Sequence, residues 1–156
     1  MYRKRDNDQL EFEKFYLPFG GKLRSDNRWV RLANAIPWDE LEDHYASLFS
    51  KDQGAPAKTF RMALGALIIK EKLNISDEET VEQIRENPYL QHLIGLNEYQ
   101  DKPPFDSSMM VHFRKRLSPE ILAEINEVIV QAALRREDDD DDRDWQFRCN
   151  TTCKYR

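Results

Sequence analysis

Apolar residues recur along this chain at steps of three and four, and this spacing limits the possible folds more than any other feature. An α-helix has about 3.6 residues per turn, so these steps place apolar side chains on one helical face. Only five glycines and few runs rich in Val, Ile and Thr argue against a β-sandwich or a doubly wound sheet. The sequence therefore predicts an all-α protein, folded as a compact multi-helix bundle.

Capping and helix-breaking residues divide this pattern into separate helices. Asp26 or Asn27 is available to cap the first helix, Pro37 separates it from the second, and residues 50–57 form a loop. The next helix is apolar around much of its circumference, so we expect it at the centre of the bundle. Its apolar positions are Phe60, Ala63, Leu64, Leu67 and Ile68.

The second half of the pattern contains further helix starts. Ser76 and Glu79 have the spacing of a capping box, in which the serine caps an amide and the glutamate reaches back. Asn87 and Pro88 begin another helix, with asparagine as the cap and proline at the first helical position. After a rigid connector we expect a short helix over 107–117, and then a last helix from the Ser-Pro-Glu sequence that follows it.

The formal net charge of −5 is concentrated near the C-terminus. Residues 137–144 hold seven acids and one base, which leaves 23 bases and 22 acids in the rest of the chain. The body is thus close to neutral, and its charge excludes no nucleic-acid partner. We expect a flexible N-terminal arm over 1–25, a helical domain over 26–136 and an acidic, disordered tail over 137–156.

Cysteine and histidine are too few and too scattered for a disulfide scaffold or a zinc site. The two cysteines, Cys149 and Cys153, are expected to be free thiols, and the three histidines lie far apart in the sequence. The acidic run lacks the spacing and the turn glycine of a calcium loop. No GxSxG, P-loop or HExxH pattern is present. We therefore expect no metal, no cofactor and no catalytic centre.

Membrane insertion is not expected. The longest apolar run, Ala63 to Ile69, is far shorter than the roughly 20 residues that span a bilayer. The first residues lead into a charged and aromatic stretch, which differs from the apolar core of a signal peptide. The expectation is a cytoplasmic protein without a membrane partner.

The densest basic cluster lies at 112–116, with the sequence HFRKR. On the expected helix, Met110, Phe113 and Leu117 share one face, and the basic side chains fall outside it. Arginine pairs bidentately with phosphate or with a guanine edge, and cations give salt-dependent affinity for nucleic acid. Alternatively, cations in a last helical turn need no ligand, because they stabilise the helix dipole by about 0.3–1 kcal/mol. The candidate DNA-binding residues are His112, Arg114, Lys115 and Arg116.

Six ordered motifs between about residues 25 and 136 resemble the N-terminal domain of InsH-type insertion-sequence transposases. They are WVRLANAIPWD at 29–39, RMALG at 61–65, LNISDEE at 73–79, RENPYLQ at 85–91, PFDSS at 104–108 and HFRKRL at 112–117. The resemblance implies a helical domain with helix-turn-helix-like elements that binds transposon ends. In that family an RNase H-like domain follows, in which three acidic residues hold two divalent metals for strand cleavage.

The sequence departs from this family after the acidic run. The family continues into an apolar strand that bears the first catalytic aspartate, whereas here residues 144–156 read DWQFRCNTTCKYR. The expectation is a truncated or frame-shifted copy that is not an enzyme, and we do not assign catalytic roles to the acids at 138–142.

The leading interpretation is a DNA-binding transposase domain without cleavage activity. The alternative is a protein-interaction module that dimerises, or that docks on a full-length transposase and inhibits it. A docking segment of this kind would use the aromatic residues near the N-terminus, and a decaying reading frame without a selected role is a third interpretation. These aromatic residues are Phe12, Phe15, Tyr16 and Phe19.

Overall fold

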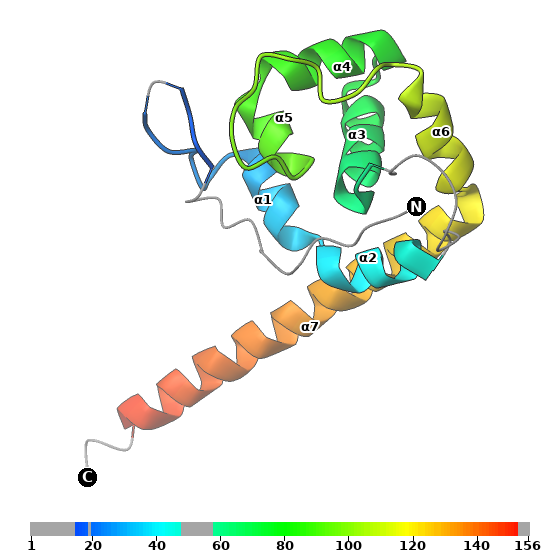
Figure 1. The fold of residues 1–156 in the computed structure, drawn as a ribbon. Helices are drawn as coiled ribbons and strands as arrows, with labels where there is room; N and C mark the ends of the chain where they lie inside the picture. Colours follow the sequence, from blue (N-terminus) through cyan, green and yellow to red (C-terminus); the bar gives the residue numbers. More distant parts are fainter. Residues whose placement is uncertain (1–14, 19, 48–57, 153–156) are drawn as a thin grey trace.

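The computed structural model describes residues 15–18, 20–47 and 58–152 (Figure 1). These residues form seven helices and no strand, which confirms the predicted all-α fold. The helices are α1 (Arg28–Ala35), α2 (Trp38–Ser47), α3 (Phe60–Leu73), α4 (Asp77–Glu86), α5 (Pro88–Leu93), α6 (Met109–Arg116) and α7 (Pro119–Thr152).

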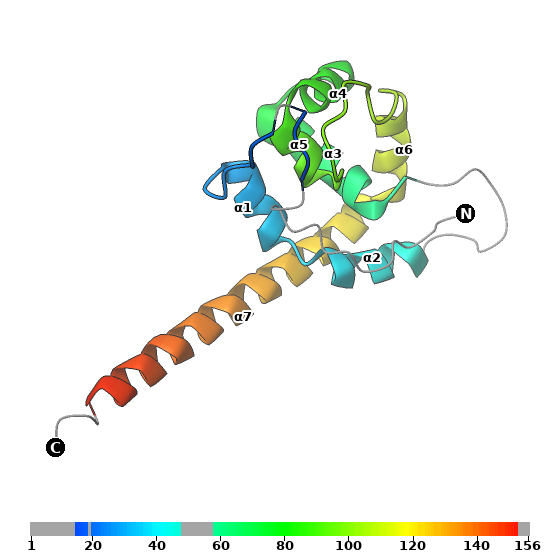
Figure 2. The ribbon, with the colours of Figure 1, turned by 60° about the vertical axis from the view of Figure 1, so that its left-hand side comes forward.

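Helix α3 lies at the centre of the bundle, as its apolar sequence predicted. It packs against α2, α4, α5 and α6, which lie around it in both views of the molecule (Figures 1 and 2). Eight of its fourteen residues are buried. Thr59 caps its N-terminus, where the hydroxyl accepts a hydrogen bond from the amide of Met62 at 3.3 Å. The neighbouring helices therefore lie around α3 and cover most of its surface.

A tight turn joins α3 to α4 and gives the pair a helix–turn–helix form. Asn74 adopts the left-handed conformation, with a φ of 52°, and so ends α3. The Ser76 hydroxyl accepts a hydrogen bond from the amide of Glu79 at 3.1 Å, which confirms the predicted cap. The Glu79 carboxylate accepts from Gln83 at 2.8 Å, so the expected reciprocal bond back to Ser76 is replaced by one along the helix.

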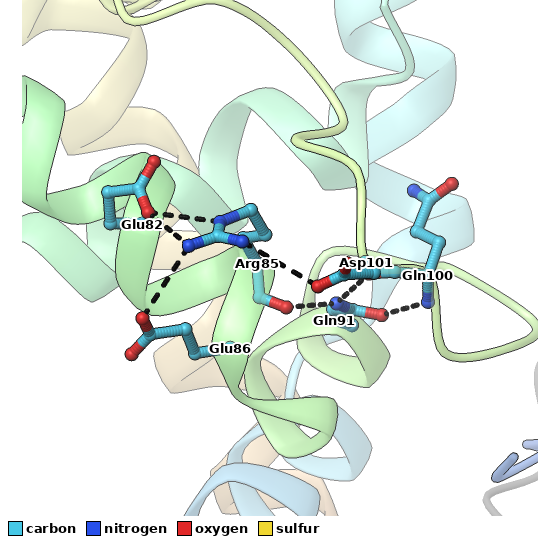
Figure 3. A network of polar contacts seen from close by, with 6 residues as sticks. All are labelled: Glu82, Arg85, Glu86, Gln91, Gln100 and Asp101. Atoms are coloured by element: carbon cyan, nitrogen blue, oxygen red, sulfur yellow. Dashed lines mark hydrogen bonds and ion pairs between the residues drawn. The ribbon is translucent and has the colours of Figure 1, made fainter.

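The connector between α5 and α6 is held by one buried side chain, Gln91 (Figure 3). Its Nε2 donates to the carbonyl oxygens of Arg85 at 3.0 Å and Gln100 at 2.8 Å, and its Oε1 accepts from the Gln100 amide at 2.9 Å. The Arg85 guanidinium adds ion pairs to Glu82 at 2.7 Å and Asp101 at 3.6 Å. The end of α4, the helix α5 and the connector are thereby fixed together.

The C-terminal end of α5 is anchored on α3 by Arg61. The Arg61 guanidinium donates to the carbonyl oxygens of Leu93 at 3.0 Å and His92 at 2.9 Å, and its Cζ lies 4.9 Å from the ring centroid of Trp38. Gly95 follows with a φ of 86°, and a Cβ there would lie 2.9 Å from the Cδ of Arg61. Both the backbone angle and the contact with Arg61 require glycine at this position.

Two apolar residues of the expected N-terminal arm pack against the helical body. Phe15 and Leu23 are buried and form a second core cluster with Val30 of α1. Two residues of the expected arm over 1–25 thus contact the body, while residues 1–14 lie outside the described residues. The physical reason is that these two apolar side chains reach the face of α1 that the main core leaves uncovered.

Helix α7 is longer than the sequence predicted. Helical patterning was expected to stop near residue 136, with a disordered tail over 137–156, whereas α7 continues to Thr152. Ile125 and Ala132 are buried in its first half, and its second half projects from the bundle (Figure 1). Once packing has fixed a helical nucleus, each further residue adds a backbone hydrogen bond, so a helix extends beyond its packed part. The division of the chain into arm, domain and tail stays a prediction.

The imidazole of His92 is fully buried in α5. Its ring meets the ring of Phe15 edge-on at a centroid distance of 5.9 Å, and its Nε2 has no hydrogen-bond partner among the described residues. Burial, followed by the positive charge of Arg61, lowers the pKa of His92 from 6.5 to about 4. The histidine is therefore neutral in the folded protein at neutral pH.

Protonation of His92 should couple stability to pH. Between pH 6.5 and about 4 the unfolded chain binds a proton that the folded chain excludes. The free energy of unfolding should therefore decrease as pH falls through this window, by up to about 3 kcal/mol. Chemical denaturation at a series of pH values measures the slope, which His92→Leu should reduce and the exposed control His112→Leu should retain. Identical slopes for wild type and His92→Leu would contradict this prediction.

Substitution of Gly95 tests the contact between α5 and Arg61. Gly95→Ala should lower the free energy of unfolding by more than the roughly 1–2 kcal/mol that a positive φ costs alanine, because the new Cβ also displaces Arg61. Gly21 is the matched control, since its φ is 97° and a Cβ there meets no atom within 4 Å. Thermal or chemical unfolding of both variants gives the comparison. Equal losses would show that the Arg61 contact contributes nothing.

Candidate nucleic-acid interface

Helix α6 carries the basic cluster found in the sequence, and it starts slightly later than residue 107. Met110 and Phe113 of α6 are fully buried, and Leu117, which follows the helix, is buried as well. The ring of Phe113 meets that of Phe105 edge-on, with centroids 5.2 Å apart. The predicted inward face of this helix is confirmed, and it fixes α6 against α3.

Asp106 organises the start of α6. Its carboxylate accepts a hydrogen bond from the amide of Ser108 at 2.9 Å, and its carbonyl oxygen accepts from the amide of Met109 at 2.9 Å. Hydrogen bonds from Ser108 lower the pKa of the Asp106 carboxyl. The local turn thus sets the direction in which the helix leaves the connector.

The four predicted DNA-binding residues lie on the outer side of α6, but their environments differ. His112, Arg114 and Lys115 are exposed, whereas Arg116 is partly buried. One terminal nitrogen of the Arg116 guanidinium is buried, so this side chain is partly enclosed by the fold. In the described part of the chain, His112 and Lys115 make no ion pair. The basic cluster therefore offers fewer accessible cations than its sequence indicated.

Arg114 is engaged by a carboxylate of the neighbouring helix. Its two terminal nitrogens donate to the two oxygens of Asp77, each at 2.8 Å, in a bidentate pair. Lys70 of α3 also lies 3.2 Å from Asp77 and donates to the carbonyl oxygen of Ile75 at 2.8 Å. The hydrogen bond from Arg114 is the main cause of the lowered pKa of Asp77. Arg114 thus holds α6 to the start of α4.

The second helix of the helix–turn–helix pair presents an acidic face to solvent. The exposed acids of α4 share its outer side, and none of them is covered by another helix. Carboxylates repel the phosphates of DNA. We conclude that α4 is unsuited to enter a DNA groove, although its position in the pair is that of a recognition helix. These acids are Glu78, Glu79, Glu82 and Glu86.

A further helix with exposed cations and no acidic residue was not predicted from the sequence to be functional. Helix α1, with the sequence RWVRLANA, buries its apolar side and exposes Arg28, Arg31 and Asn34. The signal was available in the sequence: an amphipathic helix whose polar side contains arginine and asparagine but no carboxylate. Its cations are spaced along the helix and form no dense run like that at 112–116, so this signal is weaker.

Among the described residues, no three His, Cys, Asp or Glu side chains gather where they could hold a metal ion. None of the helices in this part of the chain is long and apolar enough to cross a bilayer. The side chains of Cys149 and Cys153 and of the acids at 138–142 lie outside the described residues.

The chain matches a family model and a curated relative. A family model described as "Transposase domain (DUF772)" matches residues 18–116, from the N-terminal segment to the end of α6. A Rhizobium meliloti protein described as "Uncharacterized protein ORF8 in nfe locus" is 39% identical over 106 residues. This alignment covers 68% of the chain and 51% of the relative, so the chain spans about half the length of the curated relative it matches. No solved structure matches the chain.

The pair between Arg114 and Asp77 should show a measurable, pH-dependent coupling. A double-mutant cycle with Arg114→Ala and Asp77→Ala should give a coupling of about 0.5–1 kcal/mol at pH 7. Because the pKa of Asp77 is lowered in the folded state, this contribution is full above pH 3.8 and is lost as pH falls through the lowered value.

The exposed pair of Arg135 and Glu40, with atoms 3.4 Å apart, is the control and should couple more weakly. Denaturant unfolding of the single and double variants measures both cycles. A coupling near zero at pH 7 for Arg114 and Asp77 would contradict a structural role for Arg114.

Proposed function

Because the chain belongs to the transposase domain (DUF772) family, we propose that it acts in DNA transposition by binding DNA at transposon ends. The family match supports the transposition role, and the exposed cations of acid-free helices support the contact with DNA. Phosphate contacts provide most of the sequence-independent affinity of DNA-binding proteins. A helix that is anchored by Phe113 and exposes Lys115 on its outer side is suited to such contacts.

The four residues of α6 receive different roles in this proposal. Lys115 binds a phosphate as a flexible point charge, and His112 provides a hydrogen-bonding group beside it. Arg114 acts as a positioning residue, because its guanidinium is bound to Asp77 at 2.8 Å. Arg116 braces the end of the helix, because it is partly buried. The sequence predicted that all four residues contact DNA. In this proposal only Lys115 and His112 do so.

Strand cleavage is not assigned to these residues. In the family that the sequence resembles, three acidic residues of a separate domain hold the metals for cleavage. The proposal concerns only the recognition of DNA and assigns no catalytic role to an acid of this chain. Its partners are DNA and, for assembly at transposon ends, further transposase subunits.

Self-association is the second candidate function. On α7, Val130 and Leu134 are 56% and 55% exposed, one helical turn apart. A second copy of the chain would cover them. Of the proposed N-terminal docking aromatics, Phe15 is buried and Tyr16 is 71% exposed, while Phe12 and Phe19 lie outside the described residues. Light scattering tests this candidate. A stable dimer whose mass and dimerisation affinity are the same with and without DNA favours self-association.

Lys115→Ala should weaken DNA binding and its dependence on salt. Fluorescence anisotropy with a mixed-sequence duplex, from 50 to 200 mM salt, gives the slope of log affinity against log salt. Loss of one phosphate contact should reduce the magnitude of this slope by about 0.9. The control Lys102→Ala removes an exposed charge next to Asp101, in the connector near the acidic α4, and should change neither value. Absence of binding by the wild-type chain at low salt would refute the proposed function.

A further inference from the structure

The outer side of α1 combines the two side-chain types that distinguish bases in duplex DNA. Arg28, Arg31 and Asn34 are exposed at successive turns, while Trp29 and Ala33 face the core. Arginine donates two parallel hydrogen bonds to guanine O6 and N7, and asparagine pairs in the same way with adenine N6 and N7. With a rise of about 1.5 Å per residue, these three positions extend over about 9 Å, the height of about three base pairs.

The polar groups of this face remain accessible to a ligand. In the described part of the chain, Arg31 and Asn34 make no ion pair or side-chain hydrogen bond. The guanidinium of Arg28 lies 5.0 Å from the ring centroid of Trp29, a contact that leaves its donors available. The acid before the helix, Asp26, is bound by Arg24 at 2.6 Å and so is already neutralised. The face of α1 is therefore cationic and accessible.

The neighbouring loop adds a phosphate-binding group. Residues 20–24 form part of a loop that projects beside α1 at the left of Figure 1, and Lys22 in this loop is exposed. Gly20 and Gly21 shape the loop through φ angles of 72° and 97°, and a Cβ at either would meet no atom within 4 Å. Lys22 thus lies in an uncrowded loop next to α1. The width of an α-helix fits the major groove.

We propose that α1 is the sequence-reading element of this domain: Arg28, Arg31 and Asn34 contact base edges in the major groove, and Lys22 contacts a flanking phosphate. This inference rests on the proposed DNA binding and deepens it. It gives α1 and α6, the two acid-free helices with exposed cations, different tasks. The accessible cation of α6 is a lysine, which binds phosphates as a point charge. Helix α4 is the helix that the helix–turn–helix pair would present to DNA, but its acidic outer face makes it unsuited to read bases.

A variant that keeps the positive charge of α1 but removes its bidentate hydrogen bonding to bases tests whether α1 reads the sequence. The variant Arg28→Lys/Arg31→Lys/Asn34→Ala and the wild type are each used to enrich sequences from a randomised duplex pool, and then to bind a mixed-sequence duplex. The variant should lose about 5- to 150-fold of base preference for each contact removed, while its salt slope on the mixed-sequence duplex stays unchanged. Arg135→Lys on α7 is the matched control and should retain the wild-type preference.

The outcomes separate this inference from the proposed function. Equal preference in wild type and α1 variant, or no enrichment by a wild type that still binds DNA, would overturn the assignment of α1 and leave DNA binding intact. Failure of the wild type to bind any duplex at low salt would overturn both. A helical circular dichroism spectrum and a cooperative unfolding transition show that the variant is folded, so a loss of preference then supports the inference. Asn34→Ala alone should reduce preference at a single position of the enriched sequence.

Discussion

Burial of α3 is the constraint on which the rest of this structure depends. A helix that is apolar around most of its circumference is stable in water only if other helices cover it on several sides. Here α2, α4, α5 and α6 provide that cover. Gly65 permits close approach, since a Cβ there would lie 3.1 Å from Ile94. Each covering helix has one inner face for packing, and its remaining surface is free for function.

Electrostatics then decide which outer faces suit DNA. The outer face of α4 carries four glutamates, whereas α1 and α6 contain no acid. On α6 the structure uses Arg114 to bind Asp77 of α4, so an apparent DNA-binding arginine stabilises the contact between two helices. To bind phosphate, a charged group in such a pair must leave its partner, and this loss reduces the free energy gained on binding. Accessible cations without a carboxylate partner are the better candidates.

Much of the fold could be predicted from local chemistry. The caps at Ser76 and Asn87, the central position of α3 and the inward direction of Phe113 follow from spacing within one helix, and the structure confirms them. The length of α7 and the burial of Phe15 were missed. In both cases a distant contact decides: packing of the first half of α7 nucleates its extension, and Phe15 is covered by residues far along the chain.

The sequence by itself determined the helical class, the order of the helices and the apolar face of each, because these depend on periodicity within short segments. Only the tertiary structure decided which charges are accessible. Arg114 and Asp77 are 37 residues apart, and no local pattern reveals that their side chains meet. Ion pairing depends on the arrangement of helices around α3, so the sequence placed cations on α6, and the packing determined which of them can contact a ligand.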